Sequence, residues 1–175
     1  MVHEVGNLIL IAKIVRPHGI RGEVKVVPVI DDPEEVLIPR SFFLESQKGK
    51  GEWIEVIKAR QVNKGYLIQL RGVEDRNHAE SLRDYTLKLK KSDLPEIEGF
   101  YDTELIGLEV QTIQGDQVGL VVDILKTQAH SIFVVDSQGK DILIPDVDAF
   151  IKDVNTKKGI ILIDPIEGLL GNHAD

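Results

Sequence analysis

The chain has 175 residues, of which 42% are hydrophobic and none is cysteine, so it can form one large or two small domains without disulfides, thiol catalysis or a cysteine-based zinc site. The formal net charge of −8 argues against simple nucleic-acid binding, which usually depends on a basic surface. The apolar run at residues 8–12 is too short for a signal peptide, and no stretch reaches the roughly 18 apolar residues of a membrane helix, so we expect a soluble, cytoplasmic protein without membrane contact.

The first predicted elements are two strands joined by a tight corner. The nearly continuous apolar run Ile9–Val15 is typical of a strand buried on both faces, and Val24 and Val26 alternate with charged residues as in a half-buried strand. Between the two strands, Gly19 and Gly22 can adopt positive φ without steric cost, which lets the chain reverse sharply.

This corner carries His18 together with three basic residues, Arg16, Arg21 and Lys25. His18 can order the turn by hydrogen bonding to its backbone, contact a partner with the basic residues, or act as a general base. General-base catalysis requires a group that orients the imidazole ring and a reacting nucleophile, and the sequence offers no serine in a known arrangement. We therefore predict that the four residues contact a partner or order the turn.

The rest of the first half reads as a succession of short strands with one helix. A turn with a short helical segment is expected at Asp31–Glu35, and the helix at Glu74–Arg83 has Asp75 as a plausible N-cap. Further strands are predicted at Phe42–Glu45, Trp53–Arg60, Tyr66–Leu70 and Tyr85–Lys91, with a hairpin turn at Asn63–Gly65. Six short strands and one helix in about 90 residues indicate a closed or nearly closed β-barrel.

A polar stretch with Pro95 and Gly99 interrupts this pattern at residues 92–99, and the charge balance changes there. Residues 1–95 hold 16 Lys and Arg against 14 Asp and Glu, a balance of +2, whereas residues 96–175 hold 5 against 15, a balance of −10. We predict an N-terminal domain at residues 1–91, a linker at 92–99 and a C-terminal domain at 100–175. The two domains would face different partners, although an acidic solvated surface that only maintains solubility is the alternative.

Regularly spaced strands resume after the linker. They are predicted at Leu108–Thr112, Val118–Lys126, Ile132–Asp136, Asp141–Ile144 and Ile160–Ile163, and the remaining residues read as a tail with a docked segment at Leu169–Leu170. Short strands with regular turns indicate a second small barrel, so the predicted fold class is all-β.

Two adjacent aromatic residues, Phe100 and Tyr101, follow the linker. They cannot both point into one core from neighbouring positions of a strand. One ring in the core with the other packed between the domains is one interpretation, and an exposed anchor for a partner is the other. The histidines show no metal-ligand spacing, so no metal and no cofactor is predicted.

The run Ala12–Val26 strongly resembles the opening of the RimM family of small-subunit maturation factors. Further similarities to this family are found at four places, Asp75–Arg83, Phe100–Leu108, Asp141–Pro145 and Glu167–Leu170. The resemblance implies a translation-factor-like β-barrel followed by a PRC barrel. It also implies an assembly factor that binds the immature small ribosomal subunit near its head, through a basic ribosomal protein (small-subunit protein nineteen), and assists processing of the subunit's RNA.

From the residues and the resemblance together, we predict a non-enzymatic, monomeric ribosome assembly chaperone. The acidic second domain would attract the basic protein, with Phe100 and Tyr101 as anchors, and the first domain would contact the particle or its rRNA. An RNA-binding barrel that acts on rRNA without a protein partner is the competing hypothesis, and a small enzyme that uses His18 is a third.

Overall fold

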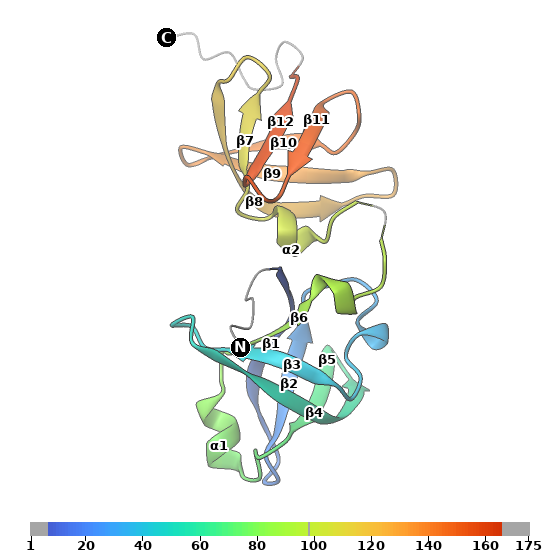
Figure 1. Cartoon of the computed structure of the whole chain (residues 1–175), viewed down its shortest axis with the longest axis vertical. Coiled ribbons are helices and arrows are strands. Elements are labelled where there is room, and N and C mark those ends of the chain that lie inside the picture. Colours follow the sequence, from blue (N-terminus) through green and yellow to red (C-terminus); the bar gives the residue numbers. More distant parts are fainter. Residues whose placement is uncertain (1–6, 98, 166–175) are drawn as a thin grey trace. The chain divides into compact units, whose positions relative to one another are not determined.

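A computed structural model describes residues 7–97 and 99–165 of the chain. The chain divides into two compact units, Met1–Glu98 and Gly99–Asp175 (Figure 1). The described part is built almost entirely from strands, with only short helices between them. Each unit is described by itself below.

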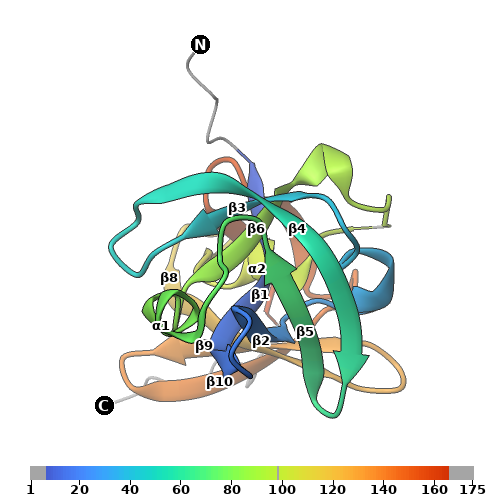
Figure 2. The ribbon, with the colours of Figure 1, turned by 90° about the horizontal axis from the view of Figure 1, so that it is seen from below.

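The first unit is a closed six-stranded barrel with the strand order β1-β2-β5-β4-β3-β6, and Figure 2 shows β4 and β5 side by side. All strand pairs in it are antiparallel. The strands are β1 (Leu8–His18), β2 (Glu23–Pro28), β3 (Ser41–Glu45), β4 (Gly51–Val62), β5 (Gly65–Leu70) and β6 (Thr86–Lys90). The short helices are η1 (Pro33–Glu35), α1 (Arg76–Ser81) and η2 (Lys91–Asp93). Tyr85, predicted as the first inward residue of the last strand, lies before β6 and is half-buried.

Alternation of apolar residues explains the core of this barrel, because successive side chains of a strand point to opposite faces. Almost completely buried side chains come from all six strands: Ile11, Ile14, Val24, Val26, Phe42, Val56, Ile68, Leu70, Leu87 and Leu89. Burying each of these side chains contributes about 1.5–3 kcal/mol. The barrel therefore holds the β1–β2 hairpin on a rigid, fully apolar support.

The corner between β1 and β2 forms as predicted, with Gly19 at φ 64° and Gly22 at φ 77°. A Cβ on Gly22 would lie 2.2 Å from the backbone oxygen of Val73, whereas a Cβ on Gly19 would meet nothing within 4 Å. Arg76 at the start of α1 donates from Nη1 to the backbone oxygen of Gly19 over 3.2 Å. The corner is thus held in place by the segment that leads into α1.

The second unit is a six-stranded sheet with the order β10-β9-β8-β7-β12-β11, in which β7 and β12 are parallel. Its elements are α2 (Asp102–Leu105), β7 (Glu109–Thr112), β8 (Gln117–Lys126), β9 (Ser131–Ser137), β10 (Lys140–Pro145), β11 (Ile151–Asn155) and β12 (Ile160–Ile163). The core of this unit is centred on a cluster of buried apolar residues that includes Val110, Val121, Phe133, Val135, Ile144, Ile161 and Ile163.

Two elements of the second unit were missed by the sequence analysis. The helix α2 has only four residues, too few to show a helical period. The strand β11 has only Ile151 and Val154 as apolar residues, and its register with β12 shifts between Ile151 and Asp153. Such a bulge interrupts the alternation by which strands are recognised. The predicted segment at Leu169–Leu170 lies outside the described residues.

The segment predicted as a linker, residues 92–99, begins inside the first unit. It includes most of η2 and also Leu94, which is buried. The residues after Leu94 that the structure describes, 95–97 and 99, are exposed. The exact extent of the linker stays a prediction.

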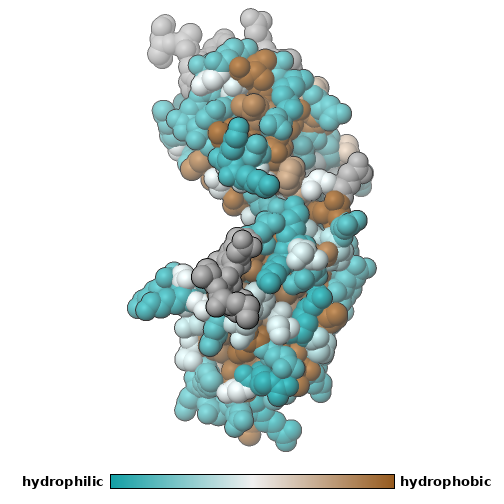
Figure 3. Space-filling view, viewed as in Figure 1, coloured by the Kyte–Doolittle hydropathy of each residue, from teal (hydrophilic) through white to brown (hydrophobic). Residues whose placement is uncertain are grey.

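Polar side chains cover most of the face that Figure 3 presents, with apolar areas between them. None of the helices in the described residues is long and apolar enough to cross a membrane.

Candidate partner-binding surfaces

The outer face of the β1–β2 hairpin brings together three of the four predicted residues of the first unit. Arg16 and His18 are exposed and flank Pro17, which is buried. Because side chains alternate along a strand, Arg16 and His18 lie on the same outer face. The register places Lys25 directly opposite Arg16, and Glu23 opposite His18. Arg21 is exposed in the turn itself.

The Arg16–Lys25 pair joins two like charges on neighbouring strands. Directly opposite residues on antiparallel strands have Cβ atoms about 5 Å apart, and like charges there are destabilising. Lys25 directs its ammonium group to the backbone oxygen of Asn63, over 3.0 Å. This contact holds the lysine on the face and does not neutralise its charge. The Lys25 ammonium group therefore lies at the turn between β4 and β5.

Two further basic residues on this face were missed by the sequence analysis. Arg60 of β4 pairs with Leu67 of β5, and Leu67 pairs with Lys25. The three cations Arg16, Lys25 and Arg60 therefore form a row across four adjacent strands, which we call the basic row. At about 4.8 Å between strands, it is about 14 Å wide. Arg60 also lies 3.5 Å from the Glu23 carboxylate.

Lys13 is the second of these residues. It is exposed on β1 between the buried Ala12 and Ile14 and lies opposite Val27. Alternation alone would place Lys13 and Arg60 on outer faces, but only the strand order and the register align Arg60 with the hairpin.

In the second unit, Phe100 and Tyr101 occupy different environments. Phe100 is half-buried and packs against the hydrophobic core of this unit. Tyr101 precedes α2, and its backbone N–H donates to Oε2 of Glu104 over 2.9 Å. Burial raises the pKa of the Tyr101 phenol, and the neighbouring Glu104 carboxylate raises it further. Both rings are half-buried, and of the two only Phe100 is among the residues packed against the core cluster.

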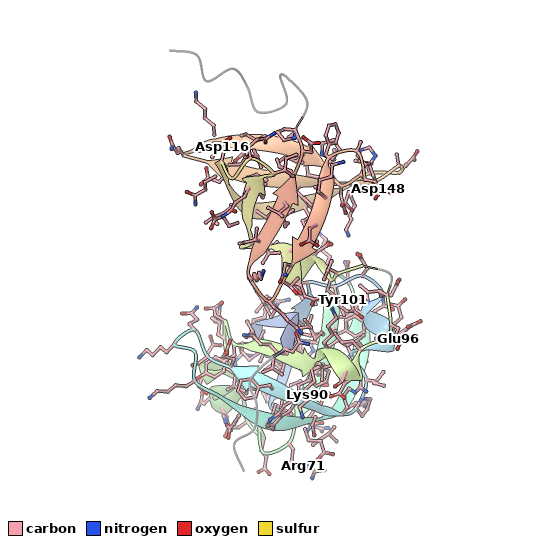
Figure 4. The ribbon with its side chains drawn as sticks, turned by 45° about the horizontal axis from the view of Figure 1, so that its top comes forward. Arg71, Lys90, Glu96, Tyr101, Asp116 and Asp148 are labelled. Atoms are coloured by element: carbon pink, nitrogen blue, oxygen red, sulfur yellow. The ribbon has the colours of Figure 1, made fainter. Side chains whose placement is uncertain are left out.

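An acidic cluster lies beside the start of α2. Asp102 accepts a hydrogen bond from Nζ of Lys126 over 2.7 Å. Burial raises the pKa of the Asp146 carboxyl; Lys126 and His130 oppose this effect, and Asp148 and Asp102 add to it. Figure 4 labels Tyr101 and Asp148 on this unit. An aromatic ring near several carboxylates is a surface suited to a basic protein.

Within residues 7–97 and 99–165, no three His, Cys, Asp or Glu side chains lie close enough together to hold a metal ion.

Comparisons with known proteins cover both units. A family model described as the RimM N-terminal domain matches residues 9–94, and one described as the RimM PRC barrel domain matches residues 102–169. The chain is 35% identical over 165 residues to a Thermobifida fusca protein named ribosome maturation factor RimM, covering 93% of this chain and 96% of that protein.

Proteins with the same name from two other bacteria show similar agreement. The identity is 36% over 165 residues for Bacillus licheniformis, covering 91% of this chain and 95% of that protein. The identity is 35% over 168 residues for Symbiobacterium thermophilum, covering 94% of this chain and 95% of that protein.

Proposed function

The chain belongs to the RimM family of ribosome maturation factors, and on this premise we propose that it is a chaperone of small-ribosomal-subunit assembly that assists maturation of the small-subunit rRNA. The matched residues span both units, which confirms the resemblance and the all-β, two-barrel fold class predicted from the motifs. In this proposal the protein acts in the cytoplasm as a monomer and binds without catalysing a reaction.

The observation that carries the proposal is the different charge of the two units. Residues 1–98 hold 16 Lys and Arg against 16 Asp and Glu, a balance of 0, whereas residues 99–175 hold 5 against 13, a balance of −8. This difference suits a protein that meets two kinds of partner. The second unit binds a basic protein of the subunit head, which we expect to be small-subunit protein nineteen. The acidic cluster at Asp102, Asp146 and Asp148, with Tyr101 beside it, supports this assignment.

The first unit contacts the rRNA of the particle. The basic row supports this assignment, because it presents Arg and Lys side chains on one outer face of the barrel, and these side chains contact phosphate oxygens in nucleic-acid complexes. His18 and Arg21 lie beside the row at the corner and extend the surface. The basic row is small, so binding to bare RNA should be weak and salt-dependent.

The first experiment separates this proposal from a barrel that acts on rRNA alone. The full chain is immobilised, and the proteins and RNA that it retains from a bacterial lysate are identified. Immature small subunits and a basic head protein should be retained, and the isolated head protein should bind more tightly than naked small-subunit rRNA. Tight binding to naked rRNA without any bound protein would support the competing hypothesis.

A pair of variants tests the role of the basic row. Replacing Arg16 and Lys25 by Gln should weaken binding to subunits and reduce the salt slope by about 1.4, since each phosphate contact to single-stranded RNA contributes about 0.7. Lys48 and Lys50 are exposed at the β3–β4 turn, outside the row, so replacing them by Gln removes the same charge as a control. If the two double variants lose the same affinity for subunits, the basic row contributes only through its charge and is not a specific contact surface.

The aromatic and acidic residues of the second unit should act on different rate constants. Changing Tyr101 to Ala should speed dissociation of the head protein, since buried aromatic anchors are worth about 2 kcal/mol or more. Replacing Asp146, Asp148 and Asp153 by Asn should instead slow association, because charge attraction speeds the encounter of the two proteins. The effect should be largest at low salt, since this attraction is screened beyond about 8 Å at physiological salt. Both constants are measured by surface binding kinetics at several salt concentrations.

A further inference from the structure

The outer face of β8, β9 and β10 carries apolar side chains that do not belong to the core. On β9, Phe133 and Val135 are part of the core cluster, whereas Val134 between them is not, although it is only 8% exposed. Because side chains alternate along the strand, Val134 points to the opposite, outer face of the sheet. The same argument places Leu143 on the outer face, since its neighbours Ile142 and Ile144 pack in the core.

The strand register joins these residues into one continuous area. Val134 lies opposite Leu143 of β10, and Ile132 lies opposite Leu125 of β8 and Pro145 of β10. Val122 lies on β8 where the register with β9 shifts between Val121 and Asp123. We call this area the outer stripe, and its members are Val122, Leu125, Ile132, Val134 and Leu143. Three of them are large apolar side chains left open to solvent: Leu143 is 50% exposed, Val122 47% and Leu125 43%. Contiguous exposed apolar groups of this kind are typical of interaction sites.

Acidic residues border the outer stripe. Asp136 of β9 lies directly opposite Asp141 of β10, and Asp123 of β8 lies opposite Val134. The Asp136–Asp141 pair places two like charges across neighbouring strands, an arrangement that destabilises a sheet. By contrast, alternation directs Lys126 and Lys140, the lysines of these three strands, to the other face. The outer face of the three strands is therefore apolar in the middle and only negative at its border.

We infer that the outer stripe docks a basic protein segment that places an apolar side chain on Leu125, Val134 and Leu143 while its Lys or Arg residues meet Asp123, Asp136 and Asp141. This inference rests on the proposed function and adds the outer stripe to Tyr101 and the acidic cluster as a surface that contacts the protein partner of the second unit. An RNA is disfavoured because the acidic border repels phosphates. A second copy of the chain is disfavoured because a two-fold interface would set this border against itself.

The test uses the full chain with two probes, immobilised immature small subunits and the salt-extracted proteins of the small subunit. Replacing both Leu125 and Leu143 by Ser should weaken binding to each probe by ten-fold or more. Ile113, in the turn between β7 and β8, is 52% exposed, so Ile113→Ser removes a comparable apolar side chain as a control. Unchanged thermal unfolding of the double variant shows that the loss is not a folding defect.

A second variant tests the acidic border. It separates a binding role from a purely structural role, because the two roles predict different effects on stability and on binding. Asp141→Asn removes the repulsion with Asp136, so it should raise the melting temperature by a degree or more and still weaken binding several-fold. Glu52 of β4, in the first unit, is exposed and belongs to neither acidic surface, so Glu52→Gln serves as the control.

The outcomes separate the inference from the proposed function. If the parent chain retains neither subunits nor any basic protein, the proposed function fails and this inference fails with it. If the parent binds and the Leu125 and Leu143 double variant binds equally well, only the docking surface is wrong. A parent that sediments as a dimer, with the double variant as a monomer, would also overturn the inference, since the stripe would then join two copies.

Discussion

At the scale of single residues, the corner between β1 and β2 depends on one glycine far more than on the other. Both Gly19 and Gly22 have positive φ, which costs any other L-residue about 1–2 kcal/mol. At Gly22 the space is also closed, because a Cβ would lie 2.2 Å from the backbone oxygen of Val73. A backbone atom cannot move aside as a flexible side chain can. At Gly22 the cost of this steric clash therefore adds to the cost of the positive φ.

Gly22→Ala should therefore lower the free energy of unfolding by about 3 kcal/mol or more. Gly19→Ala is the matched control and should cost only about 1 kcal/mol, since a Cβ there meets nothing within 4 Å. Urea unfolding of both variants measures the difference. Similar losses in the two variants would show that the corner moves away from Val73 at little cost.

Tyr66 is a second residue whose environment predicts a measurable effect. Its side chain is 5% exposed, and its hydroxyl has no hydrogen-bond partner among the described residues. Burial raises the pKa of the Tyr66 phenol, and the charge of Glu34 raises it further. A raised pKa in the folded state favours the protonated form, so this stabilisation is complete below the ordinary value of about 10 and is lost as the pH rises through the folded-state pKa.

Tyr66→Phe should accordingly leave stability at pH 7 unchanged or raise it by about 1 kcal/mol, because an unpaired buried hydroxyl is removed. The variant should also lose less stability than the parent as the pH rises above about 10. Urea unfolding of the parent and the variant at several pH values measures both the stability at pH 7 and its loss at high pH. A clear loss at pH 7 would mean that the hydroxyl is hydrogen-bonded.

At the scale of elements, α1 closes the corner end of the first barrel. Its N-cap is Asp75, as predicted, and Oδ1 of this residue accepts a hydrogen bond from the backbone N–H of His78 over 2.8 Å. The next residue, Arg76, donates to the backbone oxygen of Gly19. The cap thus orders the helix start that holds the corner carrying His18 and Arg21.

Asp75→Ala should lower the free energy of unfolding by about 1 kcal/mol. Asp75→Asn keeps an oxygen acceptor at the same place, so it should stay within a few tenths of a kcal/mol of the parent. Chemical denaturation of the three proteins checks this order. If the Ala and Asn variants lose equally, the charge of Asp75 matters rather than its hydrogen bond.

At the scale of the whole molecule, two compact units of different charge are joined near residues 95–99. Within the predicted linker, η2 and the buried Leu94 belong with the first unit, and the exposed residues follow them. Exposed polar segments of this kind are preferred sites of proteolysis. The segment offers Glu96 and Glu98 as cleavage points.

A glutamate-specific protease should therefore cut first after Glu96 or Glu98 and leave two resistant fragments. Each fragment, expressed alone, should show a β-type circular dichroism spectrum and a cooperative thermal transition. Mass spectrometry of the early products gives the cleavage site. A first cut inside a strand, or a fragment without a cooperative transition, would contradict two independently folding units.

The sequence by itself determined the features that are encoded locally. Apolar runs, alternating apolar residues and the turns between them predicted eleven of the strands by position. Gly19 and Gly22 predicted the corner, and the Asp75 position predicted the helix cap. The charge division between the two halves was also readable without a structure.

Only the tertiary structure decided which of these residues meet. Strand order and register join positions far apart in the chain, and a shift of one residue would turn each side chain to the other face. For this reason the sequence grouped Arg16 and Lys25 at one corner, but it did not predict that they lie directly opposite each other or align with Arg60. The opposition of Asp136 and Asp141, which borders the outer stripe, likewise exists only through the pairing of β9 with β10.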